Sequence, residues 1–305
     1  MMKHYSVLLD EAISNLNVLE DGTYVDATLG YGGHSKEILA RLKRGFLFAF
    51  DQDIEAINYC EDYLKQFGSN YKLVHSNFVN LKSELQKENI DHVDGILFDL
   101  GFSSPQVDDE ERGFSFMRDA KLDMRMNRDQ SLSAYEVVNN YEYEDLLNIF
   151  YTYGEENLSK QIAKKIIEKR PINTTMELVK VINEAVGNKY FSLNHPERKI
   201  FQAIRIEVNG ELKVLETVLP DAIKMLNKGG RICVITFHSL EDRIVKQIFK
   251  KYSEVDEMVK GLPNIPDEYK PLIKLVNKKP ILPSEKELTE NSRSKSAKLR
   301  VIERI

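Results

Sequence analysis

Short apolar runs that alternate with helical patterns are the feature of this sequence that most restricts its fold. Four runs bounded by glycine or acidic residues have the composition of buried strands: 23–29, 46–53, 71–77 and 93–101. Amphipathic stretches at 35–42 and 54–67 separate the first three. Strands and helices that alternate at this spacing predict right-handed βαβ units. We therefore expect an α/β fold with a mostly parallel, twisted sheet.

The alternation is interrupted in the middle of the chain. Residues 106–205 contain charged loops and helical patterns but no convincing strand. The simplest interpretation is an all-helical domain inserted into an α/β domain. We predict a discontinuous α/β domain over 1–105 and 206–305, and an inserted helical domain over 106–205 that recognises the substrate.

The α/β pattern resumes after the insertion. A helical pattern over 211–230 ends in Gly-Gly and precedes the apolar run 231–237. The segments 272–279 and 298–305 are predicted as two edge strands that pair with each other. Between them, the polar stretch 291–298 has the composition of a flexible loop.

Composition favours a soluble, cytoplasmic protein. Of 305 residues, 42% are apolar and 30% are charged, and no apolar run approaches the length of about 20 residues that spans a bilayer. The first residues do not resemble a secretory signal. Two cysteines cannot form a disulfide framework or a four-cysteine zinc site. We expect no membrane partner and no metal.

The net charge of −5 means that any contact with nucleic acid depends on local basic patches. Two stretches are basic, 160–170 and 291–305. Basic residues on a helix are more often its solvated face, and charge alone favours that interpretation. The patches gain interest only if a nucleic-acid activity is supported independently.

A glycine turn follows the first predicted strand in the stretch DATLGYGGHSKEIL, residues 26–39. Ligands of open α/β sheets bind at such strand ends. The turn lacks the Gly-Lys-Ser/Thr ending of a P-loop, and Gly30, Gly32 and Gly33 lack the spacing of a dinucleotide site. Asp26, just before the glycines, disfavours a pyrophosphate. It favours a cationic ligand without phosphate, such as S-adenosylmethionine.

Acidic residues also end the second and fourth predicted strands. Asp51 can accept both hydroxyls of a ribose, and Asp99 adds a carboxylate at the same edge. Phe78, after the third strand, can stack on an adenine. Each acid alone is as readily a helix N-cap or a turn residue. Together with the glycine turn, the acids predict a binding site for a methyl donor.

Longer motifs then resemble a known family, the ribosomal RNA small subunit methyltransferase H family, over essentially the whole chain. The motifs are HYSVLLDE, DATLGYGGHS, DLGFSSPQ, RGFSF, LDMRM, FQAIRIEVNGEL, TFHSLEDRIVK and SAKLRV. The resemblance implies a Rossmann-like class I methyltransferase fold. It also implies methylation of the exocyclic N4 of a cytidine in the decoding region of 16S rRNA, within the small ribosomal subunit.

The resemblance further implies which residues bind S-adenosylmethionine. The donor-binding positions of the family correspond to Gly32, Gly33, His34, Asp51, Phe78, Asp99 and Gln106. Asp26 and Gly30 are further candidates in the same turn. Thr28 departs from the wider class of methyltransferases, which usually has glycine there.

An exocyclic amine requires neither a thiol nor a metal for methylation by in-line displacement. Methylation at C5 of a pyrimidine would require a cysteine nucleophile. Cys233 lies in an apolar run and Cys60 in a predicted helix away from the strand ends, so both are expected to be inert. The amine must instead be drawn out of conjugation by hydrogen-bond acceptors.

The loop after the fourth strand is the candidate for that role. Ser103, Ser104 and Pro105 resemble a divergent form of the Asp/Asn/Ser-Pro-Pro-aromatic motif of amino-methyltransferases, and Pro105 restricts Ser104 to extended geometry. The alternative is an ordinary Ser-Pro turn. His238 is a second catalytic candidate and Asn209 a third, and both are equally well explained as structural hydrogen-bonding residues.

Arginines and aromatic residues are interleaved at the start of the predicted insertion, as in many single-stranded RNA sites. They are Arg112, Phe114, Phe116, Arg118, Arg125 and Arg128. The alternative is pairing of these arginines with neighbouring acids, and the two interpretations are equally supported. A target cytidine must leave its stack to reach the donor, so an insertion that holds RNA is physically reasonable.

Two other functions remain open at this point. One is a DNA amino-methyltransferase, and the other is a non-catalytic module that binds RNA or nucleotide. Loss of the glycines or of the strand-end acids would favour the binding module, and the sequence retains all of them. The sequence is compatible with a homodimer.

Overall fold

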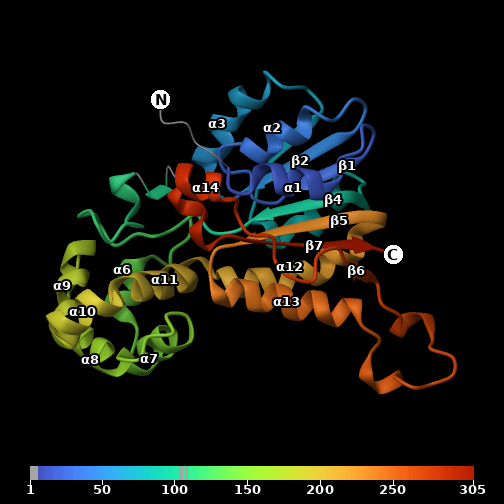
Figure 1. Ribbon diagram of the computed structural model, residues 1–305. Helices are drawn as coiled ribbons and strands as arrows, with labels where there is room; N and C mark the ends of the chain where they lie inside the picture. Colours follow the sequence, from blue (N-terminus) through green and yellow to red (C-terminus); the bar gives the residue numbers. More distant parts are fainter. Residues whose placement is uncertain (1–5, 103–105, 108) are drawn as a thin grey trace. The chain divides into compact units, whose positions relative to one another are not determined.

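A computed structural model describes residues 6–102, 106–107 and 109–305. The chain divides into two compact units (Figure 1): the first is Met1–Gly101 with Leu212–Ile305, and the second is Phe102–Glu211. The predicted insertion, 106–205, lies within the second unit. The predicted catalytic loop of Ser103, Ser104 and Pro105 lies outside the described residues.

One sheet forms the centre of the first unit. Its strands are β1 (Thr23–Asp26), β2 (Phe46–Asp51), β3 (Tyr71–His75), β4 (Val93–Asp99), β5 (Leu226–Thr236), β6 (Ile273–Leu275) and β7 (Lys298–Arg304). The spatial order is β3-β2-β1-β4-β5-β7-β6. Strands β1 to β5 are parallel, and β7 runs antiparallel to β5 and β6. This arrangement confirms the predicted Rossmann-like class I methyltransferase fold.

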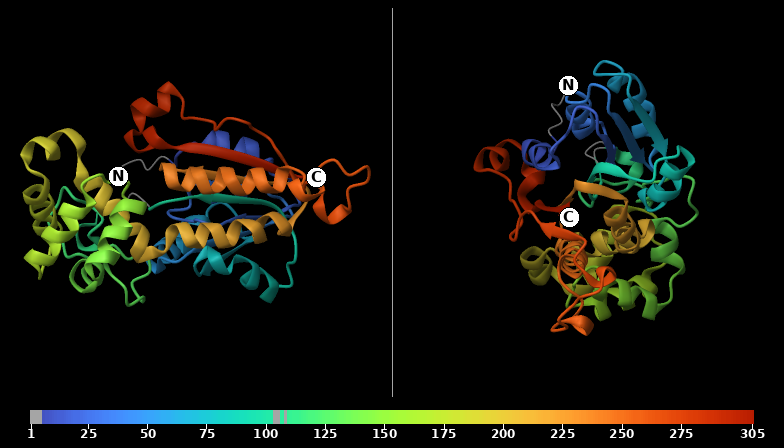
Figure 2. Two further views of the ribbon diagram at one scale, coloured as in Figure 1. Left: turned by 90° about the horizontal axis from the view of Figure 1, so that it is seen from below. Right: turned by 90° about the vertical axis from the view of Figure 1, so that its right-hand side faces the viewer.

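Helices cover both faces of this sheet. The α-helices packed around it are α1 (Leu9–Leu16), α2 (Gly33–Leu39), α3 (Ile54–Leu64), α4 (Leu81–Lys87), α12 (Glu211–Met225) and α13 (Ser239–Ser253), and α14 (Glu285–Glu290) follows β6. Helices α1, α2 and α3 pack on one face, and α4, α12 and α13 on the other. Figure 2 shows α12 and α13 running side by side along their face.

The continuous apolar character of the central strands follows from this two-sided burial. Successive side chains of a strand point to opposite faces. In β4, Ile96 and Phe98 belong to the core beneath α12 and α13, whereas Leu97 belongs to the core beneath α1, α2 and α3. Both faces therefore require apolar residues.

The predicted helix over 211–230 is too long. Helix α12 ends at Met225 and β5 begins at Leu226, so Gly-Gly lies inside the strand rather than after the helix. The reason is close packing of two strands: a Cβ atom at Gly230 would lie 2.9 Å from the carbonyl oxygen of Asp94 on β4. The glycine permits strand contact here and does not act as a helix stop.

Two predictions for the C-terminal part also need correction. β7 is not an edge strand, because it lies between β5 and β6. The stretch predicted as a flexible loop forms a 3-10 helix, Ser292–Ser296, in which Ser294 is fully buried and donates from Oγ to the carbonyl oxygen of Asn291 at 2.7 Å. Ala297 then joins the core beneath α1. Small polar residues were needed here for packing, not for mobility.

The second unit is helical, and its described residues contain no strand. Its helices are α6 (Ala134–Asn140), α7 (Tyr143–Thr152), α8 (Ser159–Lys169), α9 (Thr175–Val186), α10 (Asn188–Asn194) and α11 (Pro196–Asn209). They enclose an apolar core of their own. Local sequence determines several helix starts; α9, for example, begins at a capping box of Thr174 and Glu177. None of the described helices is both long and apolar enough to cross a lipid bilayer.

Candidate active site

The candidate site lies at the carboxyl ends of β1, β2 and β4 in the first unit. Asp26, Asp51 and Asp99 are the last residues of these three strands. β1 lies between β2 and β4, so the strand order reverses there. Such a reversal leaves a crevice at which open α/β sheets bind ligands. The structure therefore brings the three predicted acids to one edge of the sheet.

The glycine turn connects β1 to α2 at this edge. Gly32 has φ of +77°, a left-handed conformation that favours glycine, and it is the N-cap residue of α2. A Cβ atom at Gly32 would also lie 3.1 Å from Sγ of Cys60. At Gly33 a Cβ atom would collide with Oγ of Ser6. The backbone conformation and the nearby Cys60 favour glycine at position 32, and Gly33 lies against Ser6.

Asp26 lies beneath the turn and is fully buried. Its carboxylate accepts hydrogen bonds from Oγ of Ser35 at 2.6 Å and from the amide of Thr28 at 3.1 Å. Burial raises the pKa of Asp26 to about 6, and these two hydrogen bonds oppose the shift. Asp26 thus ties the strand end to the first turn of α2.

Asp51 holds the turn from the neighbouring strand. Its Oδ2 accepts from the amide of Gly30 at 2.8 Å, and its Oδ1 accepts from the amide of Asp53 at 2.8 Å. Burial raises the pKa of Asp51 to about 6 against the effect of these two bonds. The prediction for Asp51 was a contact with ribose hydroxyls. The structure adds that the same carboxylate orders the glycine turn.

Of the three acids at the site, Asp99 is the one whose charged form is most strongly disfavoured. Burial raises its pKa well above the usual range, and the charges of Asp26, Glu241 and Glu287 add to the shift. Its Oδ2 lies 3.6 Å from Nδ1 of His34. Burial lowers the pKa of His34 to about 4, so this histidine is neutral near pH 7 and does not neutralise the acid. Within the described part of the chain, Asp99 Oδ1 and His34 Nε2 are buried without a hydrogen-bond partner.

A contact of the Thr28 side chain accounts for threonine at a position where the wider class of methyltransferases usually has glycine. Its Oγ1 accepts a hydrogen bond from the amide of Asp99 at 2.7 Å. The hydroxyl therefore links the end of β1 to the end of β4, and glycine could not form this link. The sequence did not indicate that Thr28 and Ser35 belong to the site. The contact of Thr28 joins strands 71 residues apart, and that of Ser35 joins β1 to α2.

Phe78 and Gln106 lie in different units. Phe78 begins a 3-10 helix, Phe78–Asn80, after β3, and its ring meets that of Phe98 edge-on at 5.6 Å between centroids. Gln106 is buried in the second unit. A donor contact stays a prediction for both.

The cysteines are poor nucleophiles, and one lies elsewhere than predicted. Cys60 and Cys233 are fully buried, and burial raises the pKa of both thiols, that of Cys60 to about 12. Cys60 is not remote from the strand ends: its Sγ donates to the carbonyl oxygen of Gly30 at 3.4 Å. It supports the glycine turn from below.

His238 follows β5 and is the N-cap residue of α13 in a capping box with Glu241. The amide of Phe237 donates to Oε2 of Glu241 at 2.8 Å, and Nε2 of His238 lies 3.1 Å from Oε1 of Glu241. These contacts match the structural interpretation of His238. A catalytic role stays a prediction.

Asn209 has a structural role in the second unit. It is buried at the end of α11, and its Oδ1 accepts from the amide of Met126 at 2.8 Å. Its Nδ2 donates to the carbonyl oxygens of Met124 and Arg205, each at 2.9 Å. One side chain thus joins the loop around residue 125 to the helix.

We expect Asn209→Ala to lower the free energy of unfolding by about 2–4 kcal/mol, because it removes three hydrogen bonds and takes away the acceptor of the buried Met126 amide. Urea denaturation measures the change. Asn194→Ala is the matched control, since the exposed amide of Asn194 donates to the carbonyl oxygen of Tyr190 within its own helix. Unchanged stability of Asn209→Ala would contradict the structural role.

Two of the interleaved arginines also serve the fold. Arg112 is almost completely buried and donates to the carbonyl oxygens of Arg125 and Met126, both at 3.1 Å. Arg125 forms a bidentate pair with Asp123. For these two residues the structure supports pairing within the protein rather than a free RNA-binding surface.

The basic patches are partly neutralised within each unit. In the first unit, Arg300 forms a bidentate pair with Asp242, and Lys298 lies 3.4 Å from the same carboxylate. In the second, Lys169 pairs with Glu184 on α9 at 3.0 Å. Structural pairing accounts for much of the charge that sequence analysis singled out.

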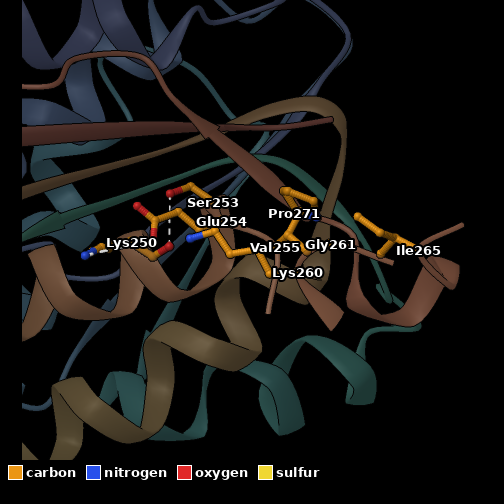
Figure 3. A pocket seen from close by; sticks show the side chains of 8 residues that line it. All are labelled: Lys250, Ser253, Glu254, Val255, Lys260, Gly261, Ile265 and Pro271. Atoms are coloured by element: carbon orange, nitrogen blue, oxygen red, sulfur yellow. Dashed lines mark hydrogen bonds and ion pairs between the residues drawn. The ribbon is translucent and has the colours of Figure 1, made fainter. Parts of the chain in front are cut away.

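A cavity of about 530 Å³ lies at the far end of α13 (Figure 3). Lys250, Glu254 and Lys260 line it, and Lys250 pairs with Glu254 at 3.9 Å. Because α13 begins beside the strand ends and this cavity lies at its last turn, none of the predicted site residues reaches it. The cavity is separate from the candidate active site.

Comparison with known proteins agrees with the motifs. Residues 1–305 match the MraW methylase family. The ribosomal RNA small subunit methyltransferase H of Exiguobacterium sibiricum is 52% identical over 309 residues, covering 100% of this chain and 99% of that protein.

Solved structures align over most of the chain at low sequence identity. An rRNA methylase from Streptococcus thermophilus is 12% identical with a TM-score of 0.40, over 97% of this chain and 93% of its own. A SAM-dependent O-methyltransferase from Thermotoga maritima is 9% identical with a TM-score of 0.43, over 100% and 68%. The full-length sequence matches confirm the resemblance predicted from the motifs. This chain belongs to the MraW methylase family.

Proposed function

We propose that this protein transfers a methyl group from S-adenosylmethionine to the exocyclic N4 of a cytidine in the decoding region of 16S rRNA, within the small ribosomal subunit. The name of the relative from Exiguobacterium sibiricum supports an rRNA substrate of the small subunit. The choice of N4 rests on the family resemblance and on the two buried, unreactive thiols. An rRNA substrate also implies action in the cytoplasm.

The observation that carries the proposal is Oδ1 of Asp99, a buried oxygen with no hydrogen-bond partner among the described residues. A buried carboxylate among other acids holds its proton more tightly, and a cation beside it favours its charged form. S-adenosylmethionine fits this requirement, because it carries an ammonium group and a sulfonium group and no phosphate. Gly32, Gly33, His34, Asp51, Phe78, Asp99 and Gln106 are the residues that we propose to hold it.

The bound donor supplies a methyl group activated by the positive sulfur. The residues of this chain orient the donor and the target amine and exclude water. Asp51 and Asp26 keep the glycine turn in one conformation. We propose Ser103, Ser104 and Pro105 for the alignment of the target amine, and no metal for the reaction.

We propose that the second unit recognises the RNA. Its exposed lysines on α8, Lys160 and Lys164, are candidates for phosphate contacts. We also propose that the protein forms a homodimer.

The test incubates the protein with S-adenosylmethionine and small ribosomal subunits that lack the modification, and maps modified nucleosides by mass spectrometry. We expect one new N4-methylated cytidine in 16S rRNA. Duplex DNA is the parallel substrate, and methylation of DNA alone would favour a DNA amino-methyltransferase. Donor binding without transfer to either would favour a binding module.

The raised pKa values of Asp26 and Asp51 predict how donor binding depends on pH. Both acids titrate near pH 6 in the folded protein, above the ordinary 3.8. As pH rises from about 4 to about 6, the unfolded chain loses these protons first, so the stability of the ligand-free protein falls. Above about pH 6 both carboxylates are charged and attract the cationic donor.

We therefore expect S-adenosylmethionine to raise the melting temperature more at about pH 7.5 than at about pH 5. Differential scanning fluorimetry with saturating donor measures the two shifts. Asp51→Asn should make the shift less dependent on pH. An equal shift at both pH values in the wild type would contradict the prediction.

A further inference from the structure

The first helix of the chain has no N-cap side chain of its own. Leu8 is its N-cap residue, in a left-handed conformation with φ of +51°, and it is completely buried. A leucine cannot accept a hydrogen bond from the helix, and the amide groups at a helix start need acceptors. The start of α1 therefore depends on a group from elsewhere.

Glu287 of α14 provides that group. Its Oε1 accepts a hydrogen bond from the amide of Leu8 at 2.9 Å, across 279 residues of sequence. A carboxylate at a helix start is also favoured by the helix dipole. Glu287 is half-buried, and the chain that follows α14 is anchored in the core through Ser294. The acceptor is therefore held in place from the C-terminal side.

The segment that Glu287 fixes lies directly on the glycine turn. A Cβ atom at Gly33 would lie 3.2 Å from Cβ of Ser6 and closer still to its Oγ, so Ser6 lies against the glycine turn. Burial lowers the pKa of His34 and the backbone of Val7 opposes that shift, so Val7 lies beside the His34 ring. Ser6 and Val7 thus lie against Gly33 and His34, the first two residues of α2.

We propose that Glu287 is a positioning residue for the methyl donor: by binding the Leu8 amide, it holds residues 6–8 against the glycine turn and keeps that turn in its binding conformation. The proposal rests on the proposed function for the identity of the ligand. The contact between Glu287 and Leu8 is independent of that function and can be tested without ligand.

The test compares three variants of Glu287 with a control on the same helix. Glu287→Gln keeps an acceptor oxygen without charge, Glu287→Asp keeps the charge but withdraws it by one methylene, and Glu287→Ala removes both. Glu290→Ala is the control, because Glu290 is exposed on α14. Dissociation constants for S-adenosylmethionine and S-adenosylhomocysteine are measured by calorimetry well below the melting temperature.

We expect Glu287→Ala and Glu287→Asp to bind both ligands about tenfold more weakly, the size expected for one lost hydrogen bond. Glu287→Gln and Glu290→Ala should stay within threefold of the wild type. KM for the donor should rise in the Ala and Asp variants, with kcat at saturating donor and KM for the RNA unchanged. Without ligand, hydrogen exchange of the Leu8 amide should be about tenfold faster in Glu287→Ala and Glu287→Asp than in the wild type.

The proposal is overturned if Glu287→Ala binds the donor within twofold of the wild type. It is also overturned if Glu287→Gln loses as much affinity as Glu287→Ala, because charge and not the hydrogen bond would then be responsible. Failure of the wild type to bind either ligand would refute the proposed function instead. In that case hydrogen exchange at Leu8 still tests whether Glu287 fixes the segment.

Discussion

Asp99→Asn is expected to weaken donor binding while making the ligand-free protein more stable. Asparagine has the same shape as aspartate but removes a charge that is buried beside Asp26 and other acids. The ligand-free variant lacks this repulsion between acids. At pH values above neutral, its melting temperature should therefore be higher than that of the wild type. The donor loses a charged partner, which corresponds to about 1.5–3 kcal/mol, or about 10- to 150-fold in Kd.

Calorimetry with S-adenosylmethionine and S-adenosylhomocysteine measures the loss, and thermal denaturation measures the gain. Asp94→Asn is the matched control, because Asp94 lies on the same strand at the opposite end and accepts from the amide of Thr23 at 2.8 Å. Its donor affinity should not change. If Asp99→Asn is less stable than the wild type, Asp99 stabilises the fold, and the prediction that its charge serves to bind a cationic ligand is contradicted.

The alternation of apolar runs was sufficient to predict the fold because each parallel strand is buried on both faces. What it could not predict was the order of the last strands. β7 follows β6 in sequence, yet it pairs with β5 and β6 on its two sides. Nothing in the apolar pattern of either segment distinguishes an edge strand from one with two neighbours, since both segments are short and mixed in polarity.

The candidate site shows the same division between local and distant signals. Asp26, Asp51 and Asp99 could be predicted because a strand end is a local feature of sequence. Their partners could not. The amide of Asp99, for example, donates to Oγ1 of Thr28 across 71 residues of sequence, and no sequence spacing indicates such a contact.

Buried polar residues outside the site were the least predictable. An arginine beside phenylalanines has the composition of an RNA-binding loop, but Arg112 donates instead to carbonyl oxygens inside the second unit. Composition describes the chemistry that a side chain can perform. The tertiary fold decides whether a backbone carbonyl or a solvent-exposed ligand is the nearest acceptor.

The series at Asp51 tests how far the donor site depends on the order of its glycine turn. Asp51→Ala leaves the amides of Gly30 and Asp53 without their acceptors. Each unsatisfied amide costs about 1–3 kcal/mol. We expect the free energy of unfolding to fall by about 2–4 kcal/mol, and donor affinity to fall at least 100-fold because the turn and a proposed ribose acceptor are lost together.

Asp51→Asn should give an intermediate result, since its amide oxygen can satisfy only one of the two amides. The control is Asp53→Ala, two residues away. Asp53 is the N-cap residue of α3 and accepts from the amide of Glu55 at 3.0 Å, so its loss should cost about 1 kcal/mol of stability. Donor Kd should then stay within threefold of the wild type. If Asp51→Ala and Asp53→Ala lose donor affinity equally, general loosening of the segment and not the turn contact at Gly30 would explain the effect.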